Sequence, residues 1–233
     1  MARTNTYQHF CPVARALEVI GEKWSLLIVR DLLRGPQRFS DLLRSLGAIT
    51  PKWLTLRLRE LEEAGIVEAD RESGRREVWY RLTERGRDLA PVISDLAVWG
   101  IDHALRPPLP GEQIHPAHAT TPFVAYLNRR RARLPEPVLW VVRFGNGRTY
   151  CIRFDGARWS IERGEAPGPA DVVVEATPEM WTRFLAGSLA ERRRCLAEMR
   201  VEGDPDRVEE LVTTLGRRER GREPAAETPG TGA

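Results

Sequence analysis

The stretch of this chain that most restricts its fold runs from residue 40 to residue 86. It reads as two short helices joined by a tight turn, followed by a hairpin whose turn is rich in arginine. The second helix opens with Thr50 and Pro51, because a hydroxyl can cap free backbone amides and proline suits the first helical position. Gly65 ends this helix, since glycine tolerates the left-handed backbone that often follows a helix. The order of these elements predicts a winged helix-turn-helix.

The second of these helices has two unlike faces. Its predicted buried side is formed by leucines at helical spacing, namely Leu54, Leu58 and Leu61. The outward side carries Lys52, Thr55, Leu56 and Arg59, and the glutamates Glu60, Glu62 and Glu63 stand only in the last turns. A helix in the DNA major groove presents its N-terminal half to base edges, where acidic groups would be repelled by phosphates. This segregation of charge favours a recognition helix over an ordinary surface helix.

The hairpin lies in IVEADRESGRREVWYRLT, where two strand-like runs flank a turn over residues 72–76. This turn contains Arg75 and Arg76, whose alternative role is to solvate the turn. Beside a recognition helix, a wing is expected to follow the DNA backbone or minor groove, where guanidinium groups meet phosphates. We therefore expect double-stranded DNA as a partner. The candidate DNA-contacting residues are Arg38, Thr50, Lys52, Thr55, Arg57, Arg59, Arg75 and Arg76.

Several separated motifs follow one another through the first half of the chain. They are Cys-Pro at 11–12, Ile-Gly-x-Lys-Trp at 20–24, Gly-x-x-Arg-Phe at 35–39, Leu-x-x-Arg-Leu-x-x-Leu at 54–61, Tyr-x-Leu-Thr-x-x-Gly at 80–86 and Trp-Gly at 99–100. In this order, over residues 7–105, they resemble the HxlR-type family of bacterial transcriptional regulators. The wing departs from the family, since members often carry a proline there and this chain has Gly74-Arg75-Arg76-Glu77.

The composition sets outer limits on the class of protein. The chain has 233 residues, 42% of them apolar, which suffices for two packed domains. Its net charge of +3 is too small to argue for nucleic-acid binding, so any DNA affinity must come from the placement of individual arginines. The chain lacks the run of about 20 apolar residues that a membrane span needs. It begins with the polar MARTNTYQH instead of a secretory leader, so we expect a cytoplasmic protein.

A proline-rich segment separates the two halves. Residues 106–120 show no helical or strand periodicity, which predicts a linker between one domain over residues 1–105 and another over residues 121–216. A helix over residues 122–135 should precede four strands, VLWVVRFG, RTYCIRFD, RWSIERG and DVVVEAT. A helix with Trp181, Phe184, Leu185 and Leu189 on one face, a fifth strand MRVEGD and a closing helix follow. The expected fold class is α+β, and residues 217–233 are expected to be disordered.

Four motifs in the second half also point to a family. They are Asp-Gly at 155–156, Asp-Val-Val-Val-Glu at 171–175, Trp-x-x-Phe-Leu-x-Gly at 181–187 and Val-Glu-Gly-Asp-Pro at 201–205. Over residues 136–216 they resemble the sterol carrier protein type-2 family. The resemblance implies helices over one face of a five-stranded sheet, with an apolar cavity between the layers for a hydrophobic small molecule. The residues expected to line it are Trp140, Val142, Phe144, Tyr150, Ile152, Trp159, Trp181 and Phe184, and a plain packed core is the alternative.

The three cysteines are odd in number and widely spaced, which indicates neither a disulfide framework nor a zinc cluster. In some members of the HxlR-type family the cysteine of the Cys-Pro pair senses oxidation, so Cys11 is a candidate redox site. A helix beginning at Pro12 would favour its thiolate, and a packing residue at a dimer contact is the alternative. Arginines beside Cys195 could lower the pKa of its thiol, or form a solvated helix face. The scattered His103, His115 and His118 lead us to expect no metal and no cofactor.

We expect a homodimer, because one domain offers one recognition helix and a two-fold dimer reads two half-sites roughly 34–36 Å apart. The dimer contact should use the first helix and the long helix after Thr83. From the latter we expect contributions by Val92, Ile93, Leu96 and Trp99. Pro91 falls inside that helix, which predicts a kink or a late helix start.

The sequence as a whole predicts a sequence-specific, DNA-binding transcriptional regulator. A hydrophobic effector in the second domain would change the spacing of the two recognition helices, provided that it favours one spacing over the other. One alternative is a redox-sensing regulator that acts through Cys11. Another is a lipid-binding or small-molecule-binding module whose first half mediates protein contacts. We find no nucleophile–base pair, phosphate loop or carboxylate dyad, so we do not expect an enzyme.

Overall fold

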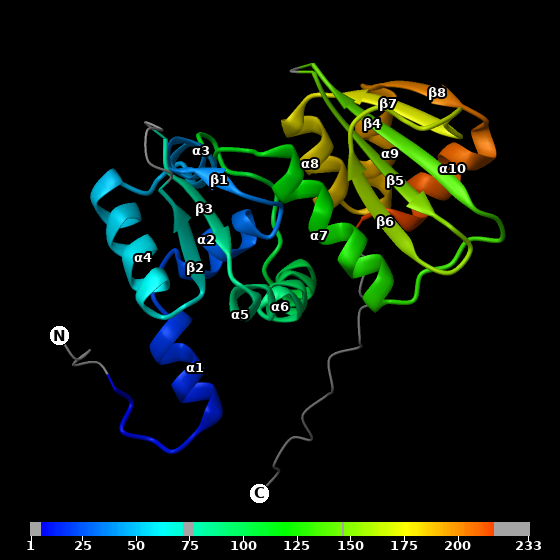
Figure 1. The fold of residues 1–233 in the computed structure, drawn as a ribbon. Coiled ribbons are helices and arrows are strands. Elements are labelled where there is room, and N and C mark those ends of the chain that lie inside the picture. The colour runs from blue at the N-terminus through cyan, green and yellow to red at the C-terminus, as the bar shows by residue number, and fades with distance from the viewer. Residues whose placement is uncertain (1–5, 72–76, 146, 217–233) are drawn as a thin grey trace, which may run out of the picture. The chain divides into compact units, whose positions relative to one another are not determined.

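The computed structural model describes residues 6–71, 77–145 and 147–216. The chain divides into two compact units, Met1–Leu96 and Ala97–Ala233, and Figure 1 shows the helices and strands of each. Their helices and two sheets agree with the expected α+β class. The predicted wing turn at 72–76 and the predicted tail at 217–233 lie outside the described residues.

The first unit combines helices with a small antiparallel sheet of strand order β1-β3-β2. Its elements are α1 (Pro12–Ile20), α2 (Ser25–Leu32), β1 (Gln37–Arg38), α3 (Phe39–Leu46), α4 (Pro51–Glu63), β2 (Val67–Asp70), β3 (Trp79–Leu82), α5 (Glu84–Arg87) and the beginning of α6 (Ala90–His103). The predicted helix pair is α3 and α4, and the predicted hairpin is β2 and β3. Strand β1 was not predicted, because two residues are too few to show alternation.

A short motif joins the β2–β3 hairpin to the end of α4. The Thr83 hydroxyl donates to the backbone oxygen of Gly65 at 2.7 Å and accepts from the amide of Gly86 at 3.1 Å, which caps α5. Gly86 is so closely packed that a Cβ there would lie 2.1 Å from the carbonyl oxygen of Ile66. Gly65 has a φ of +66°, the left-handed backbone expected after α4. The end of α4, the start of the hairpin and α5 therefore form one connected junction, called the Thr83 junction below.

The second unit contains a five-stranded sheet of order β6-β5-β4-β7-β8. Its strands are β4 (Val138–Phe144), β5 (Arg148–Phe154), β6 (Trp159–Arg163), β7 (Val172–Ala176) and β8 (Arg200–Gly203). All neighbours are antiparallel except β4 and β7, which pair in parallel. All five strands were predicted, but their spatial order was not.

One face of this sheet is covered by α7 (Pro116–Arg129), α8 (Pro178–Ala186), α9 (Leu189–Ala197) and α10 (Pro205–Thr214) (Figure 1). Alternate residues of β4, namely Trp140, Val142 and Phe144, are at most 3% exposed and belong to the core that the sheet shares with these helices. The period of two seen in the sequence therefore marks the face that the helices cover.

Two helices of the second unit differ from the prediction. Helix α7 begins at Pro116, within the predicted linker and before the expected start at Pro122. Proline is usually excluded from helix interiors, but Pro122 is tolerated here because the preceding turns are anchored by the buried Pro116, Ala117 and Thr120. The helix ends at Arg129, short of the predicted 135, and Arg131 has a positive φ of 51°.

The predicted helix from Trp181 to Leu189 is two helices, α8 and α9. At Gly187 the backbone is extended, and Ser188 starts α9 with a capping box that includes Glu191. Leu189 therefore belongs to a different helix from Trp181. By contrast, the late helix start predicted from Pro91 is confirmed, because α5 ends at Arg87 and α6 begins at Ala90.

Candidate nucleic-acid interface

The turn between α3 and α4 fixes the start of α4. Gly47 follows α3 with a φ of +64°, and Thr50 then caps α4 by accepting a hydrogen bond from the Trp53 amide at 3.4 Å. Proline at the first helical position completes the expected start. Leu54, Leu58 and Leu61 are at most 1% exposed and hold the other side of α4 in the core.

The outward face of α4 is the face that the sequence predicts. Lys52, Thr55, Leu56 and Arg59 are all exposed, as is the capping residue Thr50. The Thr55 hydroxyl donates to the carbonyl oxygen of Pro51 at 2.9 Å, so it can still accept a hydrogen bond from outside. The first half of the helix thus offers a cation and hydroxyl groups to solvent.

Each glutamate in the last turns of α4 pairs with an arginine. Glu63 accepts from Arg59 at 2.9 Å, Glu62 lies 3.1 Å from Arg71, and Glu60 lies 2.5 Å from Arg57. The first of these pairs is exposed at both ends, with 76% and 63% of the side chains accessible. Such exposed ion pairs contribute little to the free energy of unfolding, and either partner can readily pair with another ion instead.

Arg57 is not available to DNA, contrary to the prediction that it would contact it. The residue is 6% exposed, and its guanidinium lies 2.5 Å from Glu60 and 3.4 Å from Glu22. It also lies 5.7 Å from the centre of the Trp53 ring. Arg57 is positioned on the side of α4 next to the leucine stripe, where a long cation is retained only because it is paired.

Arg38 lies on β1 at the base of the wing. Its guanidinium stacks on the Trp79 ring at 4.6 Å and pairs with Glu77 at 2.7 Å, while 41% of the side chain stays exposed. Arg38 therefore packs on the base of the wing while part of its side chain stays at the surface. The other predicted wing contacts, Arg75 and Arg76, lie outside the described residues.

The residue that the sequence analysis missed is Trp53. It lies in the first turn of α4 and is 51% exposed, next to Leu56, which is 39% exposed. The sequence analysis gave Trp53 no role. The signal that could have found it is its helical position, three residues before Leu56 and off the stripe of Leu54, Leu58 and Leu61.

The three cysteines are free thiols in different surroundings. Cys11 is half-buried and is the N-cap residue of α1, as the predicted helix start at Pro12 requires. Cys151 and Cys195 are buried, and burial raises the pKa of both thiols. For Cys195, burial outweighs the neighbouring Arg183 and Arg194, which act to lower its pKa as the sequence suggested. The nearby Arg192 is itself 3% exposed and donates to the backbone oxygen of Val212 at 3.0 Å.

The residues predicted to line an apolar cavity form the core of the second unit. All eight are at most 4% exposed: Trp140, Val142, Phe144, Tyr150, Ile152, Trp159, Trp181 and Phe184. Their rings contact one another, with centroid distances of 5.0 Å for Trp140–Trp159, 5.9 Å for Phe144–Tyr150 and 5.1 Å for Trp181–Phe184. The sheet and helices therefore meet through these side chains, one of which, Phe144, also lines a pocket, and their role in holding a ligand stays a prediction.

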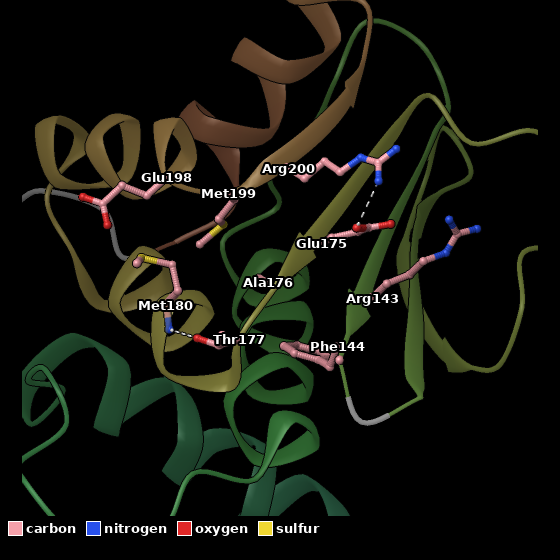
Figure 2. Close-up of a pocket in the computed structure, with 10 residues that line it drawn as sticks. Arg143, Phe144, Glu175, Ala176, Thr177, Met180, Glu198, Met199 and Arg200 are labelled. Atoms are coloured by element: carbon pink, nitrogen blue, oxygen red, sulfur yellow. Dashed lines mark hydrogen bonds and ion pairs between the residues drawn. The ribbon is translucent and has the colours of Figure 1, made fainter.

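A pocket of ≈ 570 Å³ lies instead at the end of the sheet where β4 and β7 finish. Its apolar side is formed by Phe144, Ala176, Met180 and Met199. Figure 2 shows both methionines on one side and Arg143, Glu175 and Arg200 on the other, with Arg200 and Glu175 3.8 Å apart. A molecule in this pocket would meet soft apolar groups and charges of both signs.

Two helices carry exposed apolar side chains. On α1 these are Val13 (66%) and Leu17 (41%), and on α6 they are Val92 (46%), Leu96 (50%) and Trp99 (57%). Ile93, also predicted at a dimer contact, is half-buried against the core of the first unit. The exposed residues are those that a partner surface would cover.

The described segments were also considered for groups of metal ligands and for membrane-spanning helices, and neither is found in them. No group of three His, Cys, Asp or Glu side chains in residues 6–71, 77–145 and 147–216 is arranged to hold a metal ion. Among the helices of these segments, none has both the length and the apolar character needed to cross a membrane.

Comparison with known proteins places the first half of the chain in a family. The family described as HxlR-like helix-turn-helix matches residues 19–107. The uncharacterized HTH-type transcriptional regulator sll1512 of Synechocystis is 41% identical over 96 residues, which cover 40% of this chain and 70% of that protein. This chain belongs to the HxlR family of helix-turn-helix transcriptional regulators. The HxlR match confirms the family expected for the first half.

Other HxlR-type relatives match the same part of the chain. YvaP of Bacillus subtilis, also named an uncharacterized HTH-type transcriptional regulator, is 36% identical over 95 residues, or 40% of this chain and 87% of that protein. The Mycobacterium tuberculosis regulator Rv3095 is 46% identical over 98 residues, and the chain spans 60% of its length. Among solved structures, the redox regulator HypR in its oxidized form is 41% identical, covering 39% of this chain and 94% of that one, with a TM-score of 0.37.

Proposed function

We propose that this protein is a dimeric transcriptional regulator that inserts α4 into the major groove of its operator. The observation that carries the proposal is the outward face of α4, where Lys52, Thr55 and Arg59 are exposed while the glutamates of the last turns are paired. Membership of the HxlR family supports the same role. Bound to a promoter, the dimer would block or recruit polymerase.

The test is a mobility-shift titration of the full chain on DNA from its own promoter. Replacing Arg59 by alanine should weaken specific binding by about 1–3 kcal/mol if it holds a guanine, and relax the preference at one operator position. A matched control is Arg193→Ala on α9, which removes an arginine that is 56% exposed and also ion-paired. Equal affinities of Arg59→Ala and the unmodified protein for every operator variant would contradict the placement of α4.

The wing supplies backbone contacts in this proposal. Arg75 and Arg76 would neutralise phosphates, and Arg38 at the base of the wing would assist them. The double change Arg75→Ala with Arg76→Ala should weaken binding to all sequences alike and flatten the dependence of affinity on salt, because fewer counterions are released. A salt dependence equal to that of the unmodified protein would remove the wing from the interface.

The dimer forms through α1 and α6 in this proposal. Support comes from the exposed apolar side chains of Val13 and Leu17 on α1, and of Val92, Leu96 and Trp99 on α6. A two-fold dimer would present two copies of α4 to successive turns of DNA, roughly 34–36 Å apart. DNA from the promoter would then carry two related half-sites at that spacing.

A hydrophobic small molecule bound in the second unit would control the spacing of the two recognition helices. The resemblance of residues 136–216 to the sterol carrier protein type-2 family supports this part, and the pocket beside Phe144, Met180 and Met199 is a site for such a molecule. The probe is 8-anilinonaphthalene-1-sulfonate, which is apolar with one anionic group and fluoresces when bound. Met180→Trp should reduce its binding, whereas Thr213→Trp, exposed on α10, should not. Equal binding by both variants would rule out this pocket.

Cys11 offers a second mode of control, through oxidation. Its half-buried thiol at the start of α1 supports the idea, because a sensor cysteine must be accessible to the oxidant. Diamide should release DNA from the unmodified protein and not from Cys11→Ser. Equal release from both proteins would leave Cys11 a packing residue.

A further inference from the structure

Two large apolar side chains stand on the part of α4 that otherwise carries cations and hydroxyls. Trp53 is 51% exposed and Leu56 is 39% exposed, although three leucines of the same helix are fully used by the core. They are three residues apart, so they adjoin one another on the helix surface. We call these two residues the Trp53–Leu56 patch. The patch faces outward in the folded unit, so we expect a partner molecule to cover it.

Arg57 holds one half of this patch in place. Its guanidinium lies 5.7 Å from the centre of the Trp53 ring, a distance at which a cation attracts the ring face. The guanidinium is fixed in turn by Glu60 at 2.5 Å and by Glu22 at 3.4 Å. Arg57 is thus a positioning residue, since it is buried and acts through Trp53.

The residues around the patch identify the kind of partner. Lys52 precedes Leu56 by one helical turn and Arg59 follows it by three residues, and both cations are exposed. An apolar protein surface over the patch would bury Lys52 and the Arg59–Glu63 pair away from water, which is unfavourable. A DNA groove provides phosphates for the cations and, at thymine, a methyl group for apolar side chains.

We propose that the Trp53–Leu56 patch reads thymine through its 5-methyl group in the major groove. This inference rests on the proposed function, because it requires α4 to lie in that groove. Leu56, between Lys52 and Arg59 on the outward face, contacts the methyl group, and Trp53 covers it from the side. Each operator half-site therefore contains a thymine that the protein distinguishes from the other bases by its methyl group, without a hydrogen bond to the base.

The test removes single methyl groups from the DNA and, separately, side chains from the protein. Each thymine of the footprinted promoter operator is replaced in turn by deoxyuridine, which pairs identically but lacks the methyl group. Binding of the full chain is measured by fluorescence polarisation. At one or two positions in each half-site, the loss should be about four-fold, the effect of one buried methyl group. Leu56→Ala should bind the thymine and deoxyuridine forms of those positions alike.

Four further variants complete the test, the first two of them as controls. Leu56→Met keeps an apolar side chain of similar size and should keep the sensitivity to the methyl group. Leu27→Ala removes a leucine of equal exposure, 40%, from α2 and should leave that sensitivity unchanged. Trp53→Ala should reduce the sensitivity, and Arg57→Met should reduce it less, because the ring keeps its place in part without the cation.

The outcomes separate this inference from the proposed function. Specific operator binding with no deoxyuridine effect at any position would overturn the inference and leave the proposed function intact. Methyl-dependent binding that is the same in Leu56→Ala and Trp53→Ala as in the unmodified protein would also overturn it, because other residues would then read the methyl group. Absence of specific binding to any promoter DNA would instead refute the proposed function itself.

Discussion

At the scale of single residues, two arginines of α4 illustrate how burial decides what a cation can do. Arg57 is 6% exposed and its charge is balanced by Glu60 and Glu22. Arg59 pairs with Glu63 across an exposed helix surface. An ion pair this exposed contributes at most about 1 kcal/mol to stability, so a phosphate can replace the carboxylate as the partner of Arg59. In the proposed complex, Glu63 would therefore compete with DNA for Arg59.

This competition gives a first prediction. Glu63→Gln should tighten DNA binding by about two-fold or more, because it removes both the competitor for Arg59 and a negative charge near phosphates. The measurement is the dissociation constant of the full chain on promoter DNA at two salt concentrations. Glu209→Gln, which frees Arg193 on α9 in the same manner, should have no effect. Weaker binding by Glu63→Gln would contradict the exchange of partners.

The three thiols should differ in reactivity. Burial raises the pKa of the Cys151 and Cys195 thiols, so less of their reactive thiolate form is present at neutral pH, and burial also blocks reagents. Cys11 is half-buried. Iodoacetamide should therefore label Cys11 in the native protein, and label the other two only after unfolding, as followed by mass spectrometry. Rapid native labelling of Cys195 would disagree with its described surroundings.

Sequence analysis predicted which residues of α4 face outward but not which of them are free to act. Lys52, Thr55 and Arg59 were placed correctly because the leucine period fixes the helix orientation. Arg57 was misplaced because its partner Glu22 precedes α2 and is brought near only by the fold. Trp53 was missed because large apolar residues are usually buried.

At the scale of elements, the Thr83 junction holds the wing, α4 and α5 together. Gly86→Ala would place a Cβ 2.1 Å from the carbonyl oxygen of Ile66, so the backbone would have to move. We expect the free energy of unfolding to fall by about 1–3 kcal/mol or more, as for other overpacked sites. Denaturant titration measures the effect. Gly100→Ala on α6, where a Cβ meets nothing within 4 Å, should be neutral or slightly stabilising.

Helix α7 is joined to α8 by a buried hydrogen bond. The indole Nε1 of Trp181 donates to the Thr120 hydroxyl at 3.0 Å, and this hydroxyl donates to the carbonyl oxygen of Pro116 at 2.8 Å. Thr120→Val should lower the free energy of unfolding by about 1–3 kcal/mol, because it leaves a buried indole N–H unpaired. Thr213→Val, which removes an exposed hydroxyl that bonds its own helix, should change it by less than about 0.5 kcal/mol. Similar losses in both variants would contradict the bridge.

The elements that were predicted wrongly share a cause. The start of α7 was hidden because Pro122 looks like a barrier, and only the packing of Thr120 against Trp181 shows why the helix continues through it. The break between α8 and α9 had a visible signal, because Ser188 and Glu191 have the spacing of a capping box. The apolar period from Trp181 to Leu189 concealed it.

At the scale of the whole molecule, the proposed dimer can be tested without DNA. Leu96→Glu should raise the dimer dissociation constant by roughly two orders of magnitude, because burying an unpaired carboxylate costs several kcal/mol. Sedimentation velocity over a concentration series measures it. The control is Leu109→Glu. Leu109 is as exposed as Leu96 to within a few per cent but lies in the segment between α6 and α7, so this change should leave the dimer dissociation constant unchanged. A dimer of unchanged strength in Leu96→Glu would move the interface elsewhere.

The architecture of the second unit shows the limit of reading strands one by one. Alternation of apolar residues located all five strands and the face that is buried. It gave no information on the order of the strands in the sheet. After β6, at one edge, the chain crosses over to place β7 beside β4 in parallel, and apolar alternation does not show such a crossover. The same apolar alternation describes a ligand cavity and a solid core, so it could not decide between these two roles for the residues of the sheet.

The Thr83 junction also limits how a signal can reach DNA. The Thr83 hydroxyl on the Gly65 carbonyl and Gly86 against Ile66 tie the start of the hairpin to the end of α4. In the proposed dimer, a ligand or an oxidised thiol would then act by changing the separation or tilt of the two winged helices, and not by bending one of them. Half-site spacing, more than base sequence, would be the operator property most sensitive to such a signal.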